Sequence, residues 1–271
     1  TGALTATALG IATGAAGAWT NGAGTDTTGD VGPNNYVQAV NATDIAIYDK
    51  SGNMLAGYPK TLKSLWATTP GNCDASDAGD PTVLYDQMAD RWVLTQFFEG
   101  FGNGVCIAVS TSGDPTGTYN LYEISTGAEF PDYFKIGAWP NAYYMSANES
   151  SYSAYALDRA RMLAGLSTTS IRFGGQTNLL LPADVDGSTA PASNAPGLFY
   201  TFKDSATHGG ASDRLEVFSF SPDFVTPANS TFTLAGTIPI TAFTYTVCGS
   251  FNFNCIPQKG TAQKVDPHTG K

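Results

Sequence analysis

The chain has 271 residues and a formal net charge of −10, with 13 Lys and Arg residues against 23 Asp and Glu residues. This charge repels the phosphate backbone of nucleic acids, and no apolar run reaches the roughly 20 residues of a membrane helix, so neither nucleic-acid binding nor membrane insertion is expected. Charged residues make up only 13% of the chain, which favours many short strands over long surface helices, within one extended all-β domain.

Residues 1–30 are dominated by Thr, Gly and Ala and contain one aromatic residue, Trp19. This composition offers little apolar surface to offset the entropy lost on ordering, so it predicts an N-terminal arm or linker. The segment has neither the basic start nor the continuous apolar run of a secretory signal. We therefore expect that an exported protein has already lost its signal.

Short apolar runs separated by turns begin at Val31. In the first unit, residues 35–41 and 44–49 predict two strands, residues 50–53 a tight turn, and residues 54–58 an outer strand.

The clearest unit spans residues 79–124, where turns rich in Gly, Asn, Asp and Pro separate four apolar runs. This pattern predicts a meander of four antiparallel strands, over residues 83–85, 91–98, 105–110 and 119–124.

Two further units repeat this pattern less regularly. The third predicts strands over 133–139, 142–148 and 154–158, followed either by a strand at 161–164 or by a short helix within 157–166. The fourth predicts strands over 179–181, 198–203, 214–220 and 232–236, with a proline-rich loop at 182–196.

The four units recur at roughly 50 to 60 residues, a spacing typical of propeller blades. We therefore predict an all-β fold, a β-propeller with four four-stranded blades over residues 31–240. Residues 241–271 alternate only at their start and predict a disulfide-stapled tail or the start of a further blade.

The four cysteines allow three pairings, of which Cys73 with Cys106 and Cys248 with Cys255 are the plausible set. The even count and the absence of C-x-x-C spacing favour disulfides and hence a secreted, extracellular or cell-surface protein. Four reduced, buried thiols are the alternative.

Several motifs occur in order along most of the chain from Val31. They are Asp80-Pro81 with Tyr85-Asp86 and Arg91-Trp92, Ile107-Ala108-Val109-Ser110 with Asp114-Pro115-Thr116-Gly117, Phe130-Pro131-Asp132-Tyr133, and Cys255-Ile256-Pro257-Gln258. With these motifs the chain resembles a poorly characterised family of secreted bacterial β-propeller proteins. The turn at residues 110–119 is also similar to a loose Asp-box hairpin of sialidase-type propellers, which implies a structural turn remote from any active site.

The family resemblance implies that the chain is the N-terminal part of a larger propeller. Its open edge near Thr241 would then be covered by a missing C-terminal half or by a neighbouring protein subunit. An uncovered edge of this length favours aggregation, which makes such a partner physically reasonable.

Aspartates near strand starts or in loops are candidates for chemistry. Two carboxylates flanking one bond serve glycoside hydrolysis, and alternating carboxylates suit a structural Ca²⁺ ion, here Asp184 with Asp186, or Asp80 with Asp74 and Asp77. Turn formation is the alternative for each, because Asp beside Pro or Gly accepts backbone N–H bonds. The hydrolysis candidates are Asp80, Asp86, Asp132, Asp184 and Asp186.

Aromatic residues are the second group of candidates, since a ring face and a polar edge suit sugar binding. Packing of the rings between blades is the alternative for Trp66, Trp92, Trp139, Tyr143 and Tyr144. Arg91 is expected to pair with Asp86 or Asp90 across its hairpin. The predicted ligand-binding residues are Asp86, Arg91, Asp132, Trp92 and Trp139.

The histidines, His208 and His268, offer little to a Ser-His-Asp triad or a histidine metal site. The sequence therefore predicts an extracellular propeller that acts as a binding or surface-assembly module, with glycans among its candidate ligands. The alternative is a glycan-active enzyme, a hydrolase or lyase, with its site on the axial face.

Overall fold

The structure is a computed structural model that describes residues 26–99, 102–187, 189–244 and 255–265. These residues form four four-stranded antiparallel sheets, one two-stranded hairpin and a few short helices, which confirms the all-β class. Within the described ranges, no helix is long and apolar enough to cross a membrane.

Sheet 1 contains β1 (Thr28–Val31), β2 (Asn35–Ala39), β3 (Asp44–Asp49) and β4 (Lys60–Thr61), followed by the 3-10 helix η1 (Leu62–Trp66). Its first strand begins inside the segment predicted as an arm. The outer strand predicted at 54–58 is wrong, because only Met54 forms an isolated bridge, to Tyr48, and the chain then turns at Gly57, where φ is +85°.

Sheet 2 contains β5 (Thr82–Asp86), β6 (Arg91–Glu99), β7 (Asn103–Ser110) and β8 (Tyr119–Gly127) in that order. The predicted four-stranded meander is confirmed. The β5–β6 turn places Asp90 at φ +55°, a conformation that Asp tolerates better than most residues.

Sheet 3 contains β9 (Asp132–Ala138), β10 (Tyr143–Asn148), β11 (Tyr152–Leu157) and β12 (Ser170–Gln176). The strand predicted at 161–164 is wrong, and the helical alternative is confirmed as α1 (Arg159–Leu163). Asp158 caps this helix by accepting a hydrogen bond from the Arg161 N–H at 3.1 Å, which favours a helical turn over an extended chain. The outer strand β12 lies in a segment for which no strand was predicted.

Sheet 4 contains β13 (Leu181–Pro182), β14 (Gly197–Lys203), β15 (Arg214–Ser221) and β16 (Thr231–Pro239), with α2 (Ser205–His208) and the 3-10 helix η2 (Pro227–Asn229) in its loops. All four predicted strands are present within two or three residues of their expected positions. A separate hairpin joins β17 (Ile256–Pro257) to β18 (Lys264–Val265).

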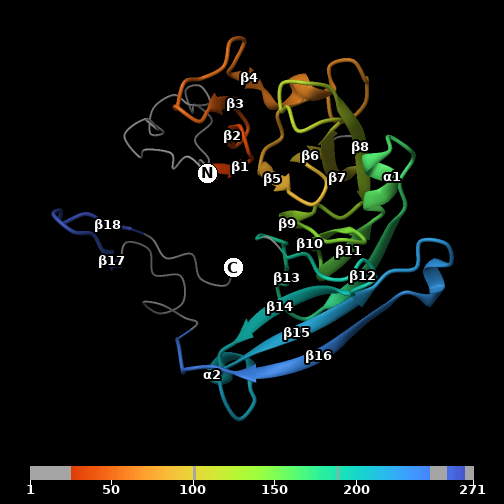
Figure 1. Ribbon diagram of the computed structural model, residues 1–271. Coiled ribbons are helices and arrows are strands. Elements are labelled where there is room, and N and C mark those ends of the chain that lie inside the picture. Colours follow the sequence, from red (N-terminus) through yellow and green to blue (C-terminus); the bar gives the residue numbers. More distant parts are fainter. Residues whose placement is uncertain (1–25, 100–101, 188, 245–254, 266–271) are drawn as a thin grey trace.

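The four sheets follow one another in an arc, with β1, β5, β9 and β13 on its inner side (Figure 1). Each of these strands contacts the next, so the sheets are arranged like consecutive blades. Buried apolar clusters fill the three junctions between neighbouring sheets. The core is therefore divided into layers, each built from facing residues of two sheets.

Candidate functional site

Asp86, at the end of β5, is completely buried at the junction of sheets 2 and 3. Its carboxylate accepts hydrogen bonds from Arg159, at 2.6 Å from Nε and 2.9 Å from Nη2, and from the Tyr143 hydroxyl at 2.8 Å. Arg159 begins α1 and Tyr143 begins β10, so the fold joins three residues that are distant in sequence. The arrangement is a bidentate Arg–carboxylate pair with two further donors, the Tyr143 hydroxyl and the Ala89 N–H, which lies 3.2 Å from Asp86 Oδ1.

The surroundings of this cluster decide its role. Burial, followed by the charge and hydrogen bond of Asp86, raises the pKa of Tyr143 well above its ordinary value, so the hydroxyl stays a proton donor. Burial acts to lower the pKa of Arg159, but its bonds to Asp86 outweigh this effect and raise it. Because Asp86 and Tyr143 do not reach solvent, the cluster stabilises the junction of sheets 2 and 3 and is not accessible to a ligand.

Arg91 does not form the ion pair predicted for it. It faces Asp86 across the β5–β6 hairpin, but its Nη1 donates to the carbonyl oxygens of Ala89 at 3.1 Å and Asp90 at 2.8 Å. The prediction is wrong because Asp86 points into the junction, where Arg159 occupies both of its oxygens, while the Asp90 carboxylate accepts from the Tyr85 hydroxyl.

Asp132 lies at the end of β9 that is remote from the Asp86 cluster. It begins β9, whereas Arg159 contacts the carbonyl of Pro140, beyond the opposite end of β9. The structure therefore does not bring Asp132 together with Asp86 or Arg91.

The two tryptophans predicted to bind ligand are packed between sheets. Trp92 is completely buried and Trp139 is 8% exposed. Their Nε1 atoms donate to backbone oxygens, of Gly113 at 3.2 Å and Ala195 at 3.1 Å. Neither ring offers a face to a ligand, and the same holds for the buried residues Trp66, Tyr143 and Tyr144.

The aspartates considered for calcium mostly organise turns. Asp74 accepts the Gly71 N–H at 2.9 Å and Asp77 accepts the Lys63 N–H at 2.7 Å, while Asp80 has φ +43° and donates its own N–H to Asn41 Oδ1. Among the residues that the structure describes, no three His, Cys, Asp or Glu side chains gather as a metal site.

Asp184 differs from these turn residues in its electrostatics. Its Oδ1 accepts the N–H of Ala138, the last residue of β9, at 2.7 Å. Asp184 reaches solvent, but neighbouring atoms of the chain partly desolvate its carboxylate and raise its pKa to about 6. The charges of Asp186 and Asp30 add to this effect. A carboxyl with this pKa exchanges protons near neutral pH.

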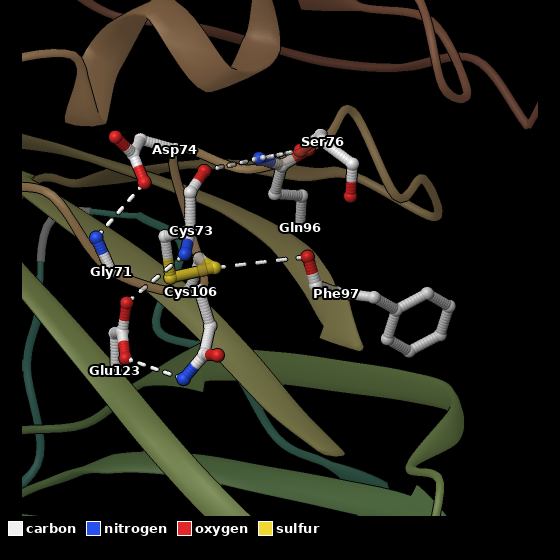
Figure 2. Close-up of a disulfide and its surroundings, with 9 residues drawn as sticks. Gly71, Cys73, Asp74, Ser76, Gln96, Phe97, Cys106 and Glu123 are labelled. Atoms are coloured by element: carbon white, nitrogen blue, oxygen red, sulfur yellow. Dashed lines mark hydrogen bonds between the residues drawn. A yellow bond between two sulfur atoms is a disulfide. The ribbon is translucent and has the colours of Figure 1, made fainter. Parts of the chain in front are cut away.

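The predicted disulfide between Cys73 and Cys106 is confirmed, with a sequence separation of 33 residues (Figure 2). It attaches the segment before β5 to the central strand β7. Glu123 accepts the Cys73 N–H at 3.0 Å, and the buried Gln96 side chain donates to the Cys73 carbonyl at 3.4 Å. Cys248 and His268 lie outside the described residues, so the pairing of Cys248 with Cys255 stays a prediction.

One face of sheet 4 carries partly exposed apolar side chains. On β14, Phe199 is completely buried against sheet 3, whereas Tyr200 and Phe202 on the opposite face are 39% and 36% exposed. Cross-strand pairing places Leu181, Leu215, Val217 and Ile238 on the same face as Tyr200 and Phe202. We call these six residues the outward face.

The chain turns back onto the outward face after β16. Asp213 holds this segment, because its carbonyl accepts the Ile240 N–H at 3.0 Å and its carboxylate accepts the Phe243 N–H at 2.7 Å. The ring of Phe243 then meets that of Phe202 edge to face, with centroids 5.6 Å apart. The polypeptide thus begins to cover the outward face.

Neither a protein-family model nor a curated protein matches this chain. The resemblance to secreted bacterial β-propeller proteins therefore stays a prediction.

Sequence reasoning missed Arg159 and the outward face. Arg159 follows a strand and a capping Asp, with no local feature that distinguishes it from the exposed Arg161. The sequence predicted the strands β14 and β15, but which of their faces is covered depends on neighbouring sheets.

Proposed function

We propose that the protein is an extracellular β-propeller that acts as a binding or surface-assembly module. A further sheet of the same polypeptide covers its outward face. The observation that carries this proposal is the exposure of Tyr200, Phe202 and Ile238 on a face whose counterparts in the other sheets are buried. Contiguous exposed apolar surface marks an interaction site.

The source of the covering sheet is argued from the connection that follows β16. The chain passes directly onto the outward face, where Phe243 packs on Phe202. A sheet that continues from this point repeats the packing of sheets 2, 3 and 4 on their predecessors. A neighbouring subunit is the alternative source.

The test begins with intact mass spectrometry and size-exclusion chromatography of the protein isolated from its source. We expect a polypeptide longer than 271 residues, in which Tyr200→Ala lowers the free energy of unfolding by about 3 kcal/mol because a covered aromatic ring is lost. The matched control is Val225→Ala, in a loop where Val225 is 93% exposed, with an effect below about 0.5 kcal/mol.

Two outcomes would reject this assignment. A monomer of this chain alone that melts cooperatively and is indifferent to Tyr200→Ala has no covering sheet. A second polypeptide that copurifies and protects the face places the covering sheet in a neighbouring subunit.

A glycan-active enzyme is the second candidate function that we propose, on the basis of Asp184. Burial, with smaller effects from the charges of Asp186 and Asp30, raises the pKa of Asp184 to about 6, which meets one requirement of a general acid. Reducing-end release from a panel of polysaccharides tests this candidate. Activity must fall at least 100-fold in Asp184→Asn, and that of the wild type must decline above about pH 6. A wild-type protein without activity on these polysaccharides would reject the enzyme as a candidate function.

A further inference from the structure

A groove of about 750 Å³ lies between sheets 1 and 2, where the β1–β2, β5–β6 and β7–β8 turns meet. This volume is in the range of small-ligand sites. The residues that matter for its chemistry are Asn34, Asn35, Tyr85, Asp90, Ser112 and Asp114. None of them belongs to the outward face or to the Asp86 cluster.

The floor of the groove is fixed by packing and hydrogen bonds. The Tyr85 ring lies on the buried Trp92 ring, with centroids 5.0 Å apart, and Trp92 Nε1 donates to the Gly113 carbonyl. The Ser110 hydroxyl accepts the Trp92 N–H at 2.8 Å and donates to the Ser112 carbonyl at 2.6 Å. The β5–β6 and β7–β8 sides of the groove are therefore positioned before any ligand arrives, which lowers the entropic cost of binding.

Polar atoms at the groove retain capacity for a ligand. Asp90 Oδ1 accepts from the Tyr85 hydroxyl, and Asp114 Oδ1 accepts from the N–H and hydroxyl of Thr116 at 2.9 and 2.8 Å. Among the described residues, the Oδ2 atoms of both aspartates and the side-chain amide of Asn34 have no hydrogen-bond partner. Two carboxylate acceptors and one amide are thus available at one groove.

Glycine at position 113 sets the shape of the groove wall. A Cβ atom added to Gly113 would lie 2.3 Å from Asp90 Oδ1, so any larger residue displaces this carboxylate. The close approach of the β7–β8 turn to Asp90 therefore depends on the missing side chain.

We propose that this groove binds a neutral saccharide. Neighbouring sugar hydroxyls donate to carboxylate and amide oxygens, and the half-buried Tyr85 ring offers an apolar surface to the C–H groups of a sugar. Among the described residues, no Lys, Arg or His lines the groove, so its two carboxylates repel uronic acids, sialic acids and phosphates. The polar lining also disfavours apolar peptides. The inference rests on the proposed binding role, but its site is distinct from the outward face.

The experiment is isothermal titration calorimetry of the natural protein with neutral hexasaccharides of glucose, xylose and mannose. Polygalacturonate and CaCl₂ alone serve as comparison probes. We expect one neutral saccharide to bind, and Asp90→Asn and Asp114→Asn each to weaken it about tenfold, because each removes one charged acceptor. Asn is well tolerated at the positive φ of residue 90, so this variant keeps the turn.

Two further variants separate a binding role from a structural one. Gly113→Ala must weaken binding by displacing the Asp90 carboxylate without lowering the melting temperature by more than a few degrees. The matched control is Asp158→Asn, which keeps the cap on α1 and lies outside the groove, and it must leave binding unchanged.

The proposal is overturned if no neutral saccharide binds, if only CaCl₂ or polygalacturonate binds, or if binding is indifferent to Asp90→Asn and Asp114→Asn. Protection of Tyr200 by a covering sheet is measured separately. Loss of either result leaves the other standing, so failure of the groove and failure of the proposed assembly are distinguishable.

Discussion

Sheets 2 and 4 present similar apolar faces but bury them to different extents. Facing sheet 3, the sheet 2 residues Val105, Ile107 and Val109 on β7 are completely buried. The corresponding central strand of sheet 4, β15, places Leu215 and Val217 on the outward face, where they are half-buried. Alternation along a strand thus creates an apolar face, and only a neighbouring sheet turns it into core.

Each covered junction also contains a disulfide, an ion pair or a side-chain hydrogen bond that stabilises it. The Cys73–Cys106 disulfide lies at the cluster between sheets 1 and 2, the Asp86–Arg159 pair between sheets 2 and 3, and the Asp184 bond to Ala138 between sheets 3 and 4. At the outward face, the only comparable contact among the described residues is that of the Phe243 ring with the Phe202 ring. We therefore expect the energetic cost of substitutions to follow this difference.

The largest effect is expected from breaking the ion pair between sheets 2 and 3. Arg159→Leu leaves the buried Asp86 carboxylate without its positively charged partner, which costs about 3–5 kcal/mol of the free energy of unfolding. Urea unfolding measures this loss. Arg161→Leu, on the same helix but exposed, is the control with a loss below about 1 kcal/mol, and equal losses for the two would remove the special role of this junction.

The disulfide between sheets 1 and 2 is expected to have the next largest effect. Replacing both Cys73 and Cys106 by Ser opens a loop of 33 residues and costs about 3–4 kcal/mol by chain entropy. Thermal melting of the wild type under reducing conditions must approach that of the double variant. A double variant that melts like the oxidised wild type would show that this junction does not depend on the bond.

A matched pair of valine substitutions tests the comparison of the two faces directly. Val105→Ala removes two methyl groups from a closed core and costs about 2–3 kcal/mol, whereas Val217→Ala on the outward face costs less than about 1 kcal/mol in this chain alone. Denaturant titration gives both values. In the longer polypeptide proposed above the two losses converge, and equal losses in this chain alone would mean that the outward face is already covered.

The smallest effect concerns pH and the junction of sheets 3 and 4. The pKa of Asp184 is raised to about 6 in the folded protein, from an unfolded value near 4, so the folded state binds more protons between these values. Its contribution to stability is complete below about pH 4 and is lost as the pH rises through 6. The melting temperature of the wild type, compared with Asp184→Asn, must therefore rise on acidification from pH 7 to pH 4.5. A constant difference between the two proteins contradicts the shifted pKa.

Much of the strand pattern was predictable because it is local. The turns around Asp90 and Asp114 and the alternation of sheet 2 predicted the positions of its strands closely. The errors occurred where local signals compete, as at α1, where the cap by Asp158 outweighed the apolar run, and at residues 54–58, where Gly57 redirects the chain. The pairing of Cys73 with Cys106 belonged to the plausible set among the three pairings that four cysteines allow.

The candidate sites were harder to predict because they join distant segments. Asp86 was singled out by its turn, but its partner Arg159 lies 73 positions away and carries no local signal. Trp92 was assigned to a ligand, whereas the fold uses its ring as the floor under Tyr85. The groove itself combines turns of two sheets, and no single turn predicts it.

The sequence by itself determined the all-β class, the fourfold repetition of short strands and the turns that separate them, because φ/ψ preferences and period-two alternation act over a few residues. The tertiary structure decided which apolar faces are buried, which arginine pairs with the Asp86 carboxylate and which turns meet at a groove. These properties depend on contacts between sheets, and the free energy of burial and ion pairing is set by the neighbour across the junction rather than by the strand that carries the residue.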